Sequence, residues 1–178
     1  MKRLFAILLA MFAMTTAAAA ADPENTLLLE LKDGTVVIEL RPDLAPNHVA
    51  RIKELTRQGF YDGILFHRVI EGFMAQTGDP TGTGMGGSGK KLKAEFTNEP
   101  FVRGTLGMAR AQSPDSADSQ FFICFQPARF LDGQYTVLGR VISGMEFVDK
   151  IKRGLGQSGS VPAPQDKIIS LKVQADVK

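Results

Sequence analysis

The sequence predicts a mostly-β fold, arranged as an antiparallel sandwich or a closed barrel with two helices. It contains about eight short apolar runs, each bounded by Gly, Pro, Asp or Ser. These runs mostly do not alternate with helices, which disfavours a parallel βαβ sheet. The chain has 178 residues, of which 44% are hydrophobic and 22% charged, and this size and composition suit one globular domain.

A hairpin and a helix are the first elements expected in this domain. Alternating leucines after Thr26 predict a strand, and a turn at residues 32–35 leads into a second strand that ends at Leu40. A helix is predicted to begin at Pro46, because proline suits the first helical position and apolar residues recur at spacings of three after it. Gly59 is placed to end this helix.

The later part of the domain is predicted to hold the other strands, a second helix and one long loop. The strands are expected at residues 65–70, 73–77, 105–109, 120–125, 135–141 and 168–173. The second helix is expected over residues 146–152, which have one apolar side. Residues 78–93 are rich in glycine and have no periodicity, which indicates a long surface loop of the kind that is often functional.

Residues 1–21 are typical of a cleavable signal peptide. A basic start is followed by an apolar run from Leu4 to Met14 and then by alanines that fit a cleavage site near Ala20 or Ala21. The run is shorter than the roughly 20 residues of a membrane span, and we expect no stable membrane anchor. The alternative is a buried N-terminal helix. We expect export, in a bacterium to the periplasm, and a single domain over residues 22–178.

Charge and cysteine content argue against nucleic-acid binding and against a reactive thiol. Without Lys2 and Arg3, the 21 basic residues of the chain fall to 19, which equals the 19 acidic residues. The predicted mature domain is therefore formally neutral, and we expect no nucleic-acid partner. Cys124 is the only cysteine and lies in the apolar run FFICF. It is interpreted as a small buried hydrophobe rather than a reactive thiol.

Four tempting patterns are weak. Residues 82–87 fit the dinucleotide pattern G-x-G-x-x-G, but no helix pattern follows them. Residues 84–90 fit the start of a phosphate-binding loop, yet Lys91 stands where Ser or Thr would hold magnesium. The two histidines, His48 and His67, lie on unrelated elements and make a poor metal site. A Ser-His-Asp triad is compatible with the composition, but no serine has a nucleophile-elbow context.

Three separated segments, residues 66–76, 104–111 and 119–133, share one chemical character. Each places aromatic or aliphatic side chains beside amide or guanidinium donors. For any one segment, a packed core with Arg68 and Gln76 at the surface is the simpler interpretation. Together the three segments fit a concave, mostly apolar site with a few placed polar groups better.

These segments resemble a known family. The motifs FHRVIEGFMAQTGDP, GTLGMARA and SQFFICF, followed by FLDG, are similar to the signature blocks of the cyclophilins, which are peptidyl-prolyl cis-trans isomerases. The resemblance runs from about Thr26 to Val173. It implies a closed eight-stranded antiparallel β-barrel capped by two α-helices, with a packed interior and a site on the outer face. It implies no cofactor and no metal.

The resemblance also assigns the site residues. Arg68 matches the catalytic arginine of the family. Residues that match peptide-binding positions are His67, Phe73, Met74, Gln76, Ala109, Arg110, Ala111, Gln120, Phe122, Phe130, Leu131 and Tyr135. Those that match the floor and walls of the proline pocket are Phe73, Met74, Phe122 and Leu131. The two glutamines match side chains that hold the peptide or position the arginine, and residues 109–111 match the strand edge beside the substrate backbone.

Three residues depart from the family pattern. Phe130 stands where the best-known eukaryotic members carry tryptophan, and Tyr135 stands where they carry histidine. Similar substitutions occur in bacterial exported cyclophilins that bind cyclosporin poorly, so we expect weak cyclosporin binding. Arg110 replaces a common asparagine. Because the family uses the backbone there, the change is expected to alter sequence preference and to leave activity intact.

The chemistry of prolyl isomerisation explains this residue set. Amide resonance gives the X-Pro bond a rotation barrier of about 18–20 kcal/mol, whereas cis and trans differ by only about 0.5–1 kcal/mol. Rotation localises the lone pair on the prolyl nitrogen, and a permanently charged donor aimed at it stabilises the twisted state. The expected partners are proline-containing segments of exported proteins, and the protein is expected to be a monomer. A peptide-holding module without turnover and a small-molecule-binding barrel are the alternatives.

Overall fold

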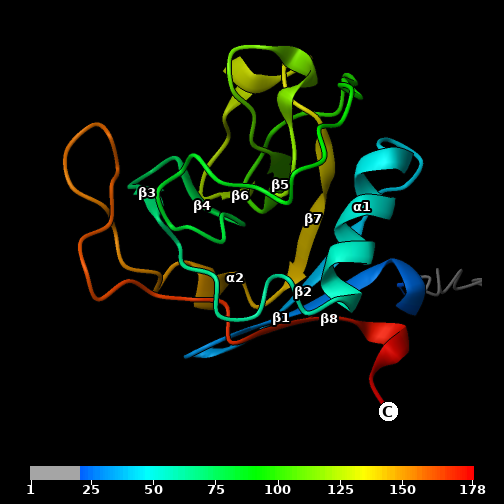
Figure 1. Ribbon diagram of the computed structural model, residues 1–178, viewed down its shortest axis with the longest axis horizontal. Helices are drawn as coiled ribbons and strands as arrows, with labels where there is room; N and C mark the ends of the chain where they lie inside the picture. The colour runs from blue at the N-terminus through cyan, green and yellow to red at the C-terminus, as the bar shows by residue number, and fades with distance from the viewer. Residues whose placement is uncertain (1–20) are drawn as a thin grey trace, which may run out of the picture.

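The computed structural model describes residues 21–178, so all but the last residue of the predicted signal peptide lies outside the described residues. Figure 1 shows the arrangement of the elements. The two helices are α1 (Pro46–Arg57) and α2 (Met145–Val148). The strands are β1 (Thr26–Leu31), β2 (Gly34–Leu40), β3 (Arg68–Ile70), β4 (Met74–Thr77), β5 (Thr105–Met108), β6 (Phe121–Cys124), β7 (Val137–Ser143) and β8 (Ser170–Val173). Among the described helices, none is long and apolar enough to cross a membrane.

The strands form one antiparallel sheet in the order β3-β4-β6-β5-β7-β2-β1-β8. The mostly-β fold with eight antiparallel strands and two helices is thereby confirmed. The prediction of a closed barrel is wrong, because β3 and β8 are the two ends of the sheet and do not pair with each other. The sheet curves into an open half-barrel, in which β7 joins the two halves (Figure 1).

The loop at residues 154–160 occupies the exposed edge of the short strand β3. Val69 N–H donates to the carbonyl of Gly159 at 2.8 Å, and Gly154 N–H donates to the carbonyl of Val69 at 2.8 Å. The segments before the two end strands are linked by an isolated bridge of Leu65 with Lys167 and by backbone hydrogen bonds beside it. Gly63 N–H donates to the carbonyl of Ile168 at 2.8 Å, and Phe66 N–H donates to that of Asp166 at 2.9 Å. Hydrogen-bonding groups of β3 that a closed barrel would pair with another strand are therefore satisfied by a loop.

Helix α1 begins and ends as the sequence predicts. Pro46 is its first residue, and Gly59 follows its last turn with φ at 70°. Gly59 N–H donates to the carbonyl of Thr56 at 3.0 Å, and Phe60 N–H donates to that of Leu55 at 3.0 Å, which closes the helix as a Schellman motif. The second helix is shorter than predicted, because it ends at Val148 and only isolated turns follow.

The buried apolar residues form two clusters on opposite faces of the sheet. The main core lies inside the half-barrel, under α1, and includes Phe121 and Ile123 of β6. The smaller cluster lies on the outer face and consists of Met74, Phe101, Phe122, Cys124, Ala128, Leu131 and Val137. Because side chains alternate along a strand, β6 contributes residues to both clusters. Both faces of the strand are therefore buried, which explains why its sequence is a continuous apolar run.

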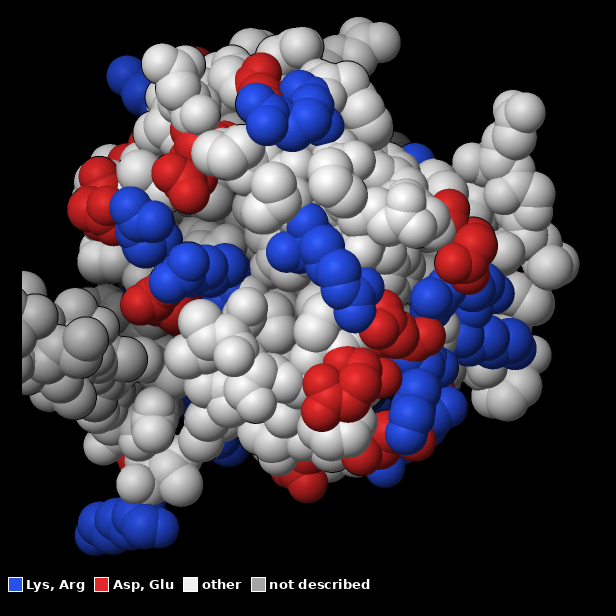
Figure 2. Space-filling model, turned by 180° about the vertical axis from the view of Figure 1, so that it is seen from behind, with Lys and Arg blue, Asp and Glu red and all other residues white. Residues whose placement is uncertain are grey.

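Cys124 confirms its interpretation as a buried hydrophobe. Its side chain is fully buried in the smaller cluster, and burial raises the pKa of its thiol to about 12. The charged residues lie outside both clusters. On the face that Figure 2 shows, acidic and basic side chains are interspersed, so that face has no continuous field of one sign.

Candidate functional site

The centre of the candidate site is a row of residues across three neighbouring strands. Arg68 on β3 lies opposite Gln76 on β4, and Gln76 lies opposite Phe122 on β6. Residues directly opposite in antiparallel strands project from the same face of the sheet. The register therefore brings a guanidinium, an amide and an aromatic ring together on the outer face, above the smaller apolar cluster.

A cavity of about 230 Å³ opens beside this row. Its lining consists of Arg68, Phe73, Met74, Gln76, Ala109, Arg110, Phe122, Phe130, Leu131 and Tyr135. All of these residues belong to the set that the sequence assigned to the site. The cavity is small and open to one side, and most of its lining residues are apolar, which suits a small apolar group better than a large ligand.

Aromatic packing fixes the floor of this cavity. The ring of Phe122 stacks on that of the buried Phe101, with centroids 5.9 Å apart, and meets Tyr135 edge-on at 6.0 Å. Glycine at position 107 permits this stack, because a Cβ atom there would lie 2.4 Å from Phe122 Cζ and 2.6 Å from Phe101 Cε1. At the rim, Phe130 is 66% exposed and packs against Phe73.

A chain of hydrogen bonds crosses the polar side of the cavity. Arg68 Nη1 donates to Gln76 Oε1 at 3.1 Å, and Arg68 Nε donates to the carbonyl of Ser158 at 3.1 Å. Gln76 Nε2 donates to Gln120 Oε1 at 2.9 Å. Within the described chain, Arg68 Nη2 makes no hydrogen bond. The guanidinium is thus held at two nitrogens while its third remains available beside the apolar pocket.

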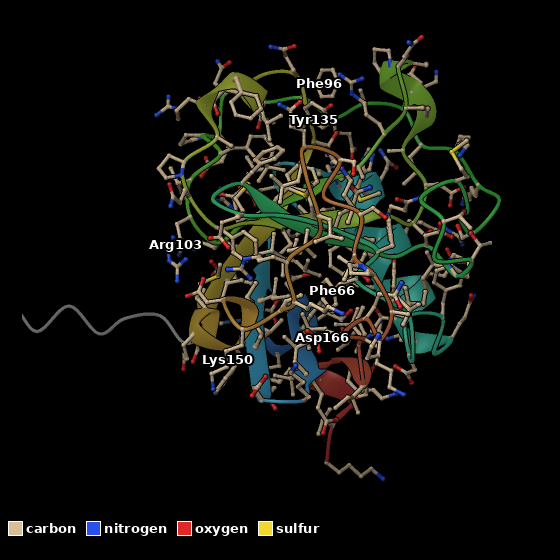
Figure 3. All side chains as sticks on the ribbon, turned by 90° about the vertical axis from the view of Figure 1, so that its left-hand side faces the viewer. Phe66, Phe96, Arg103, Tyr135, Lys150 and Asp166 are labelled. Carbon is tan, nitrogen blue, oxygen red and sulfur yellow. The ribbon has the colours of Figure 1, made fainter. Side chains whose placement is uncertain are left out.

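The side chain of Arg110 folds back on the protein. Its guanidinium lies 4.4 Å from the centroid of Tyr135 and 5.8 Å from that of Phe96, and it donates to the carbonyls of Ala111, Gln112 and Gln134. Tyr135 and Phe96 lie near each other at one end of the molecule (Figure 3). The backbone N–H and C=O of Arg110 take part in no hydrogen bond among residues 21–178, so this edge can pair with an extended peptide.

A second cavity, of about 260 Å³, continues the first. The two cavities share Gln76, Ala109 and Arg110. The second also contains Ala111 and Gln120, which do not line the first, and the 91%-exposed Met85. Except for His67, the predicted peptide-binding residues therefore lie along one continuous groove, with the smaller cavity at one end.

His67 is the one predicted site residue that the structure places outside the groove. Its ring is 7% exposed and lines neither cavity of the groove. It lies beneath the glycine-rich loop, where a Cβ atom at position 84 would be 3.5 Å from its Cδ2 atom. Burial lowers the pKa of His67, against the opposing effect of Asp79, and the neutral ring is favoured. Its neighbour Arg68 faces the groove because successive strand residues point to opposite sides.

The glycine-rich loop that imitates a nucleotide motif is folded around Asp79. The carboxylate, 1% exposed, accepts from Thr81 N–H at 2.7 Å, Gly84 N–H at 2.6 Å and Gly86 N–H at 3.1 Å. Burial raises the pKa of Asp79, but the hydrogen bonds outweigh it and hold the pKa at about 2. Successive backbone N–H groups in a concave loop often bind an anion. In this loop, the anion that they bind is the carboxylate of Asp79.

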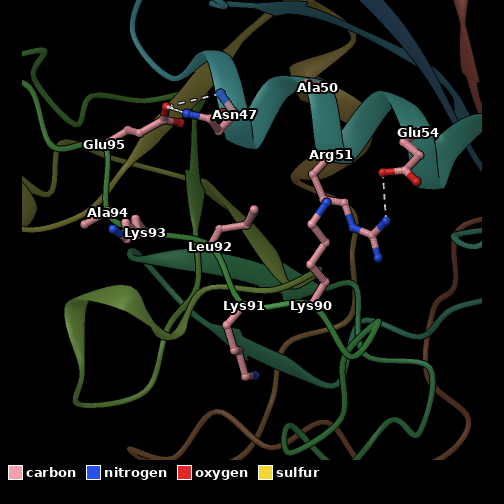
Figure 4. A pocket seen from close by; sticks show the side chains of 10 residues that line it. All are labelled: Asn47, Ala50, Arg51, Glu54, Lys90, Lys91, Leu92, Lys93, Ala94 and Glu95. Carbon is pink, nitrogen blue, oxygen red and sulfur yellow. Dashed lines mark hydrogen bonds and ion pairs between the residues drawn. The ribbon is translucent and has the colours of Figure 1, made fainter.

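A larger cavity, of about 480 Å³, lies between α1 and residues 90–95 and holds none of the predicted site residues (Figure 4). Its charged groups are partly neutralised by local pairs. Arg51 pairs with Glu54 at 2.8 Å, and the Glu95 carboxylate accepts from Asn47 N–H at 3.1 Å. Lys90 extends toward α1 beside Arg51, whereas Lys91 points away from it (Figure 4). We place the site in the smaller cavity, because only there do apolar walls meet an anchored guanidinium.

Comparison with known proteins identifies the family. Residues 26–173 match the family model described as cyclophilin type peptidyl-prolyl cis-trans isomerase/CLD. The chain belongs to this family. A Brucella suis protein named "Probable peptidyl-prolyl cis-trans isomerase" is 59% identical over 174 residues, which cover 90% of this chain and 88% of that protein. The resemblance found in the sequence motifs is confirmed, and the chain is an enzyme of the peptidyl-prolyl cis-trans isomerase class.

Solved structures of cyclophilins have the same fold. A cyclophilin from Hirschia baltica is 29% identical with a TM-score of 0.78, covering 89% of this chain and 77% of that one. A cyclophilin type isomerase from Cryptosporidium parvum, crystallised in the presence of the dipeptide Ala-Pro, is 29% identical with a TM-score of 0.76. That match covers 83% of this chain and 98% of the other.

Sequence reasoning missed three contributors to this cyclophilin site. Phe101 supports the ring of Phe122 from below, but in the sequence it is one phenylalanine in an irregular segment. Ser158 contacts Arg68 through its backbone carbonyl, to which any residue type could contribute. Asp79 could have been found from the sequence. An aspartate followed by three alternating glycines is typical of a loop whose backbone N–H groups donate to the carboxylate.

Proposed function

We propose that Arg68 catalyses prolyl isomerisation by stabilising the twisted X-Pro bond. Twisting removes amide resonance and localises a lone pair on the prolyl nitrogen, which then accepts a hydrogen bond from the guanidinium. The planar ground state offers no such lone pair, so the interaction is stronger in the transition state than in the substrate. No nucleophile is required for this step.

The apolar pocket and the groove would hold the two sides of the bond apart. In this proposal the prolyl ring sits on Met74, Phe122 and Leu131, which are at most 6% exposed and offer no competing polar group. The flanking backbone pairs with the unbonded edge at Arg110. Fixing the ring and the flanking chain separately lets the bond rotate between them.

One observation carries the proposal: Arg68 is anchored at two nitrogens, by Gln76 and by Ser158, while lining a cavity whose other residues are mostly apolar. A guanidinium that served only a surface ion pair would face an acid. Within the described residues, Arg68 forms no salt bridge. An unneutralised cation aimed into an apolar pocket suits the stabilisation of an electron pair that appears during reaction.

The test is a coupled-protease assay on an X-Pro peptide with wild type and Arg68→Ala. We expect kcat/KM to fall about 100- to 1,000-fold, as when one preorganised donor is removed from a transition-state site. Arg140→Ala is the matched control, because Arg140 is an exposed strand arginine that pairs with Glu39 and lines neither cavity of the groove. Equal rates for wild type and Arg68→Ala would refute the role of Arg68.

We further propose that the substrates are proline-containing segments of exported proteins, and that the enzyme assists their folding in a bacterial periplasm. The support is the order of basic start, apolar run and alanines in residues 1–21. N-terminal sequencing of the protein from periplasmic extract should give a chain that begins near Asp22. Recovery of the intact N-terminus from the cytoplasmic fraction would contradict export.

We also propose that cyclosporin binds weakly. Phe130 at the rim is 66% exposed and, unlike a tryptophan, has no indole N–H to donate. Tyr135 is engaged by the guanidinium of Arg110, 4.4 Å from its centroid. Inhibition of the same assay by cyclosporin measures this directly, and nanomolar inhibition would exclude it.

A further inference from the structure

The glycine-rich loop presents two backbone carbonyls to the polar side of the site. Gln120 Nε2 donates to the carbonyl of Gly84 at 3.0 Å and to that of Gly86 at 2.8 Å. A carbonyl can only accept a hydrogen bond, so it admits one orientation of the facing amide. Two such carbonyls side by side fix which end of the Gln120 amide faces the loop and which faces the active site.

The orientation of the Gln120 amide determines the orientation of the Gln76 amide, which accepts the hydrogen bond from Arg68. With its nitrogen at the loop, Gln120 turns its oxygen to Gln76, which must then present its own nitrogen. Gln76 is left with its oxygen toward Arg68 Nη1. If the Gln120 amide were reversed, Gln76 would reverse too, and an NH₂ group would face the guanidinium. That arrangement removes the acceptor and places two donors against each other.

We propose that Asp79 is a positioning residue for catalysis, which sets the orientation of Arg68 through the glycine-rich loop, Gln120 and Gln76. The inference rests on the proposed role of Arg68. Asp79 lines neither cavity of the groove and does not touch the bound peptide in this scheme. It acts by holding Gly84 and Gly86 so that their carbonyls point at Gln120. The loop keeps this shape because the Asp79 carboxylate lies at its centre.

The bonds of Asp79 account for the loop's shape. One carboxylate oxygen, Oδ2, accepts from both Gly84 N–H and Gly86 N–H, the residues whose carbonyls bind Gln120. The other, Oδ1, accepts from the N–H and the hydroxyl of Thr81. A Cβ atom at position 86 would lie 2.1 Å from Asp79 Oδ1, so only glycine lets the backbone wrap this closely. An asparagine has one acceptor oxygen and cannot satisfy both sets of donors.

The kinetic signature follows from where Arg68 acts. An interaction made only in the transition state changes kcat, whereas one made equally in the bound substrate changes KM. Misorientation of Gln76 loosens Arg68 and leaves the apolar pocket in place. Asp79→Asn should therefore lower kcat about 3- to 10-fold, the kinetic equivalent of one hydrogen bond, with KM unchanged.

Asp166→Asn is the matched control. Asp166 also accepts from a loop backbone, at 2.7 Å from Lys152 N, and it pairs with Lys32 at 2.7 Å. Asp166 lines neither cavity of the groove and lies well apart from Tyr135 (Figure 3). The control should lose stability without a change in kcat. An equal fall of kcat in both variants would assign the effect to general destabilisation and overturn the proposal.

A double-mutant cycle with Gln76→Ala gives the sharpest test. If Asp79 acts through Gln76, then Asp79→Asn should lower kcat in wild type and leave it unchanged in the Gln76→Ala background. The same fall in both backgrounds would overturn the relay. Arg68→Ala in parallel separates the two claims. A large loss there with no effect of Asp79→Asn would retain the proposed mechanism and reject the role of Asp79.

Gln120→Glu tests the same hydrogen-bond chain and can be used if Asp79→Asn fails to fold. This variant leaves Asp79 and its own hydrogen bonds in place, but a carboxylate cannot donate to the carbonyls of Gly84 and Gly86. We expect kcat to fall at least about 3-fold, again only when Gln76 is present. An unchanged kcat would show that the polarity of the chain does not matter, and would overturn the proposal.

Discussion

The two faces of strands β4 and β6 differ in how they are held together. On the inner face, Ala75 and Ile123 pack with the main core, which consists of buried aliphatic and aromatic side chains. On the outer face, Met74 and Phe122 form the floor of an open cavity whose rim is bonded through Arg68, Gln76 and the loops. The same strands thus carry a closed core on one side and a preorganised site on the other.

This difference indicates that stability and activity draw on different interactions. Burial of apolar surface is non-directional and depends on area, so it supports the inner face without fixing any single group. Catalysis requires one guanidinium at one place, which only directional hydrogen bonds provide. Substitutions on the two faces should therefore change different measured quantities, with the largest free-energy effect on the inner face.

Ile123→Ala should give the largest change in stability. The side chain is fully buried in the main core, and its removal leaves a cavity that costs about 2–5 kcal/mol of unfolding free energy. The kcat and KM of the folded enzyme should match wild type, because Ile123 packs in the main core and lines neither cavity of the groove. Denaturant unfolding and the isomerase assay measure both quantities. A raised KM would show that the two faces are not independent.

Acid should weaken the glycine-rich loop on the outer face, through Asp79. Its pKa falls from 3.8 to about 2 on folding, so its charge stabilises the folded state by about 2 kcal/mol above pH 4. A depressed carboxyl pKa means that this contribution is lost as the pH falls from about 4 to about 2. The pH-dependent part of the stability difference between wild type and Asp79→Asn should shrink toward zero over that window. A difference that stays constant to pH 2 would contradict the assignment.

Phe121→Leu and Phe122→Leu form a pair that sharpens the comparison with the smallest expected effects. Phe122 would lose its aromatic contacts with Phe101 and Tyr135, worth about 1 kcal/mol, and KM should rise roughly fivefold. Phe121 packs on Tyr61 in the main core, so its variant should lose a similar stability with KM unchanged. Equal KM values for the two variants would remove Phe122 from the pocket floor.

The sequence by itself determined the local elements and the family. Strand positions followed from short apolar runs between turn residues, and α1 was predicted with both its ends, because Pro46 and Gly59 act through their own backbone geometry. The cavity residues were assigned from motifs that recur as blocks in a family. Each of these inferences depends on neighbours in the chain or on conserved spacing, and both are readable without coordinates.

Only the tertiary structure decided how the distant parts meet. It showed that β3 and β8 leave the barrel open, that His67 lies under a loop, and that Ser158 reaches Arg68 across 90 positions of sequence. Such contacts depend on sheet curvature, on register and on backbone carbonyls that every residue type possesses, so composition carries no trace of them. For the same reason, the sequence predicted the glycine-rich segment as a surface loop, and only the structure showed that its backbone is folded around the Asp79 carboxylate.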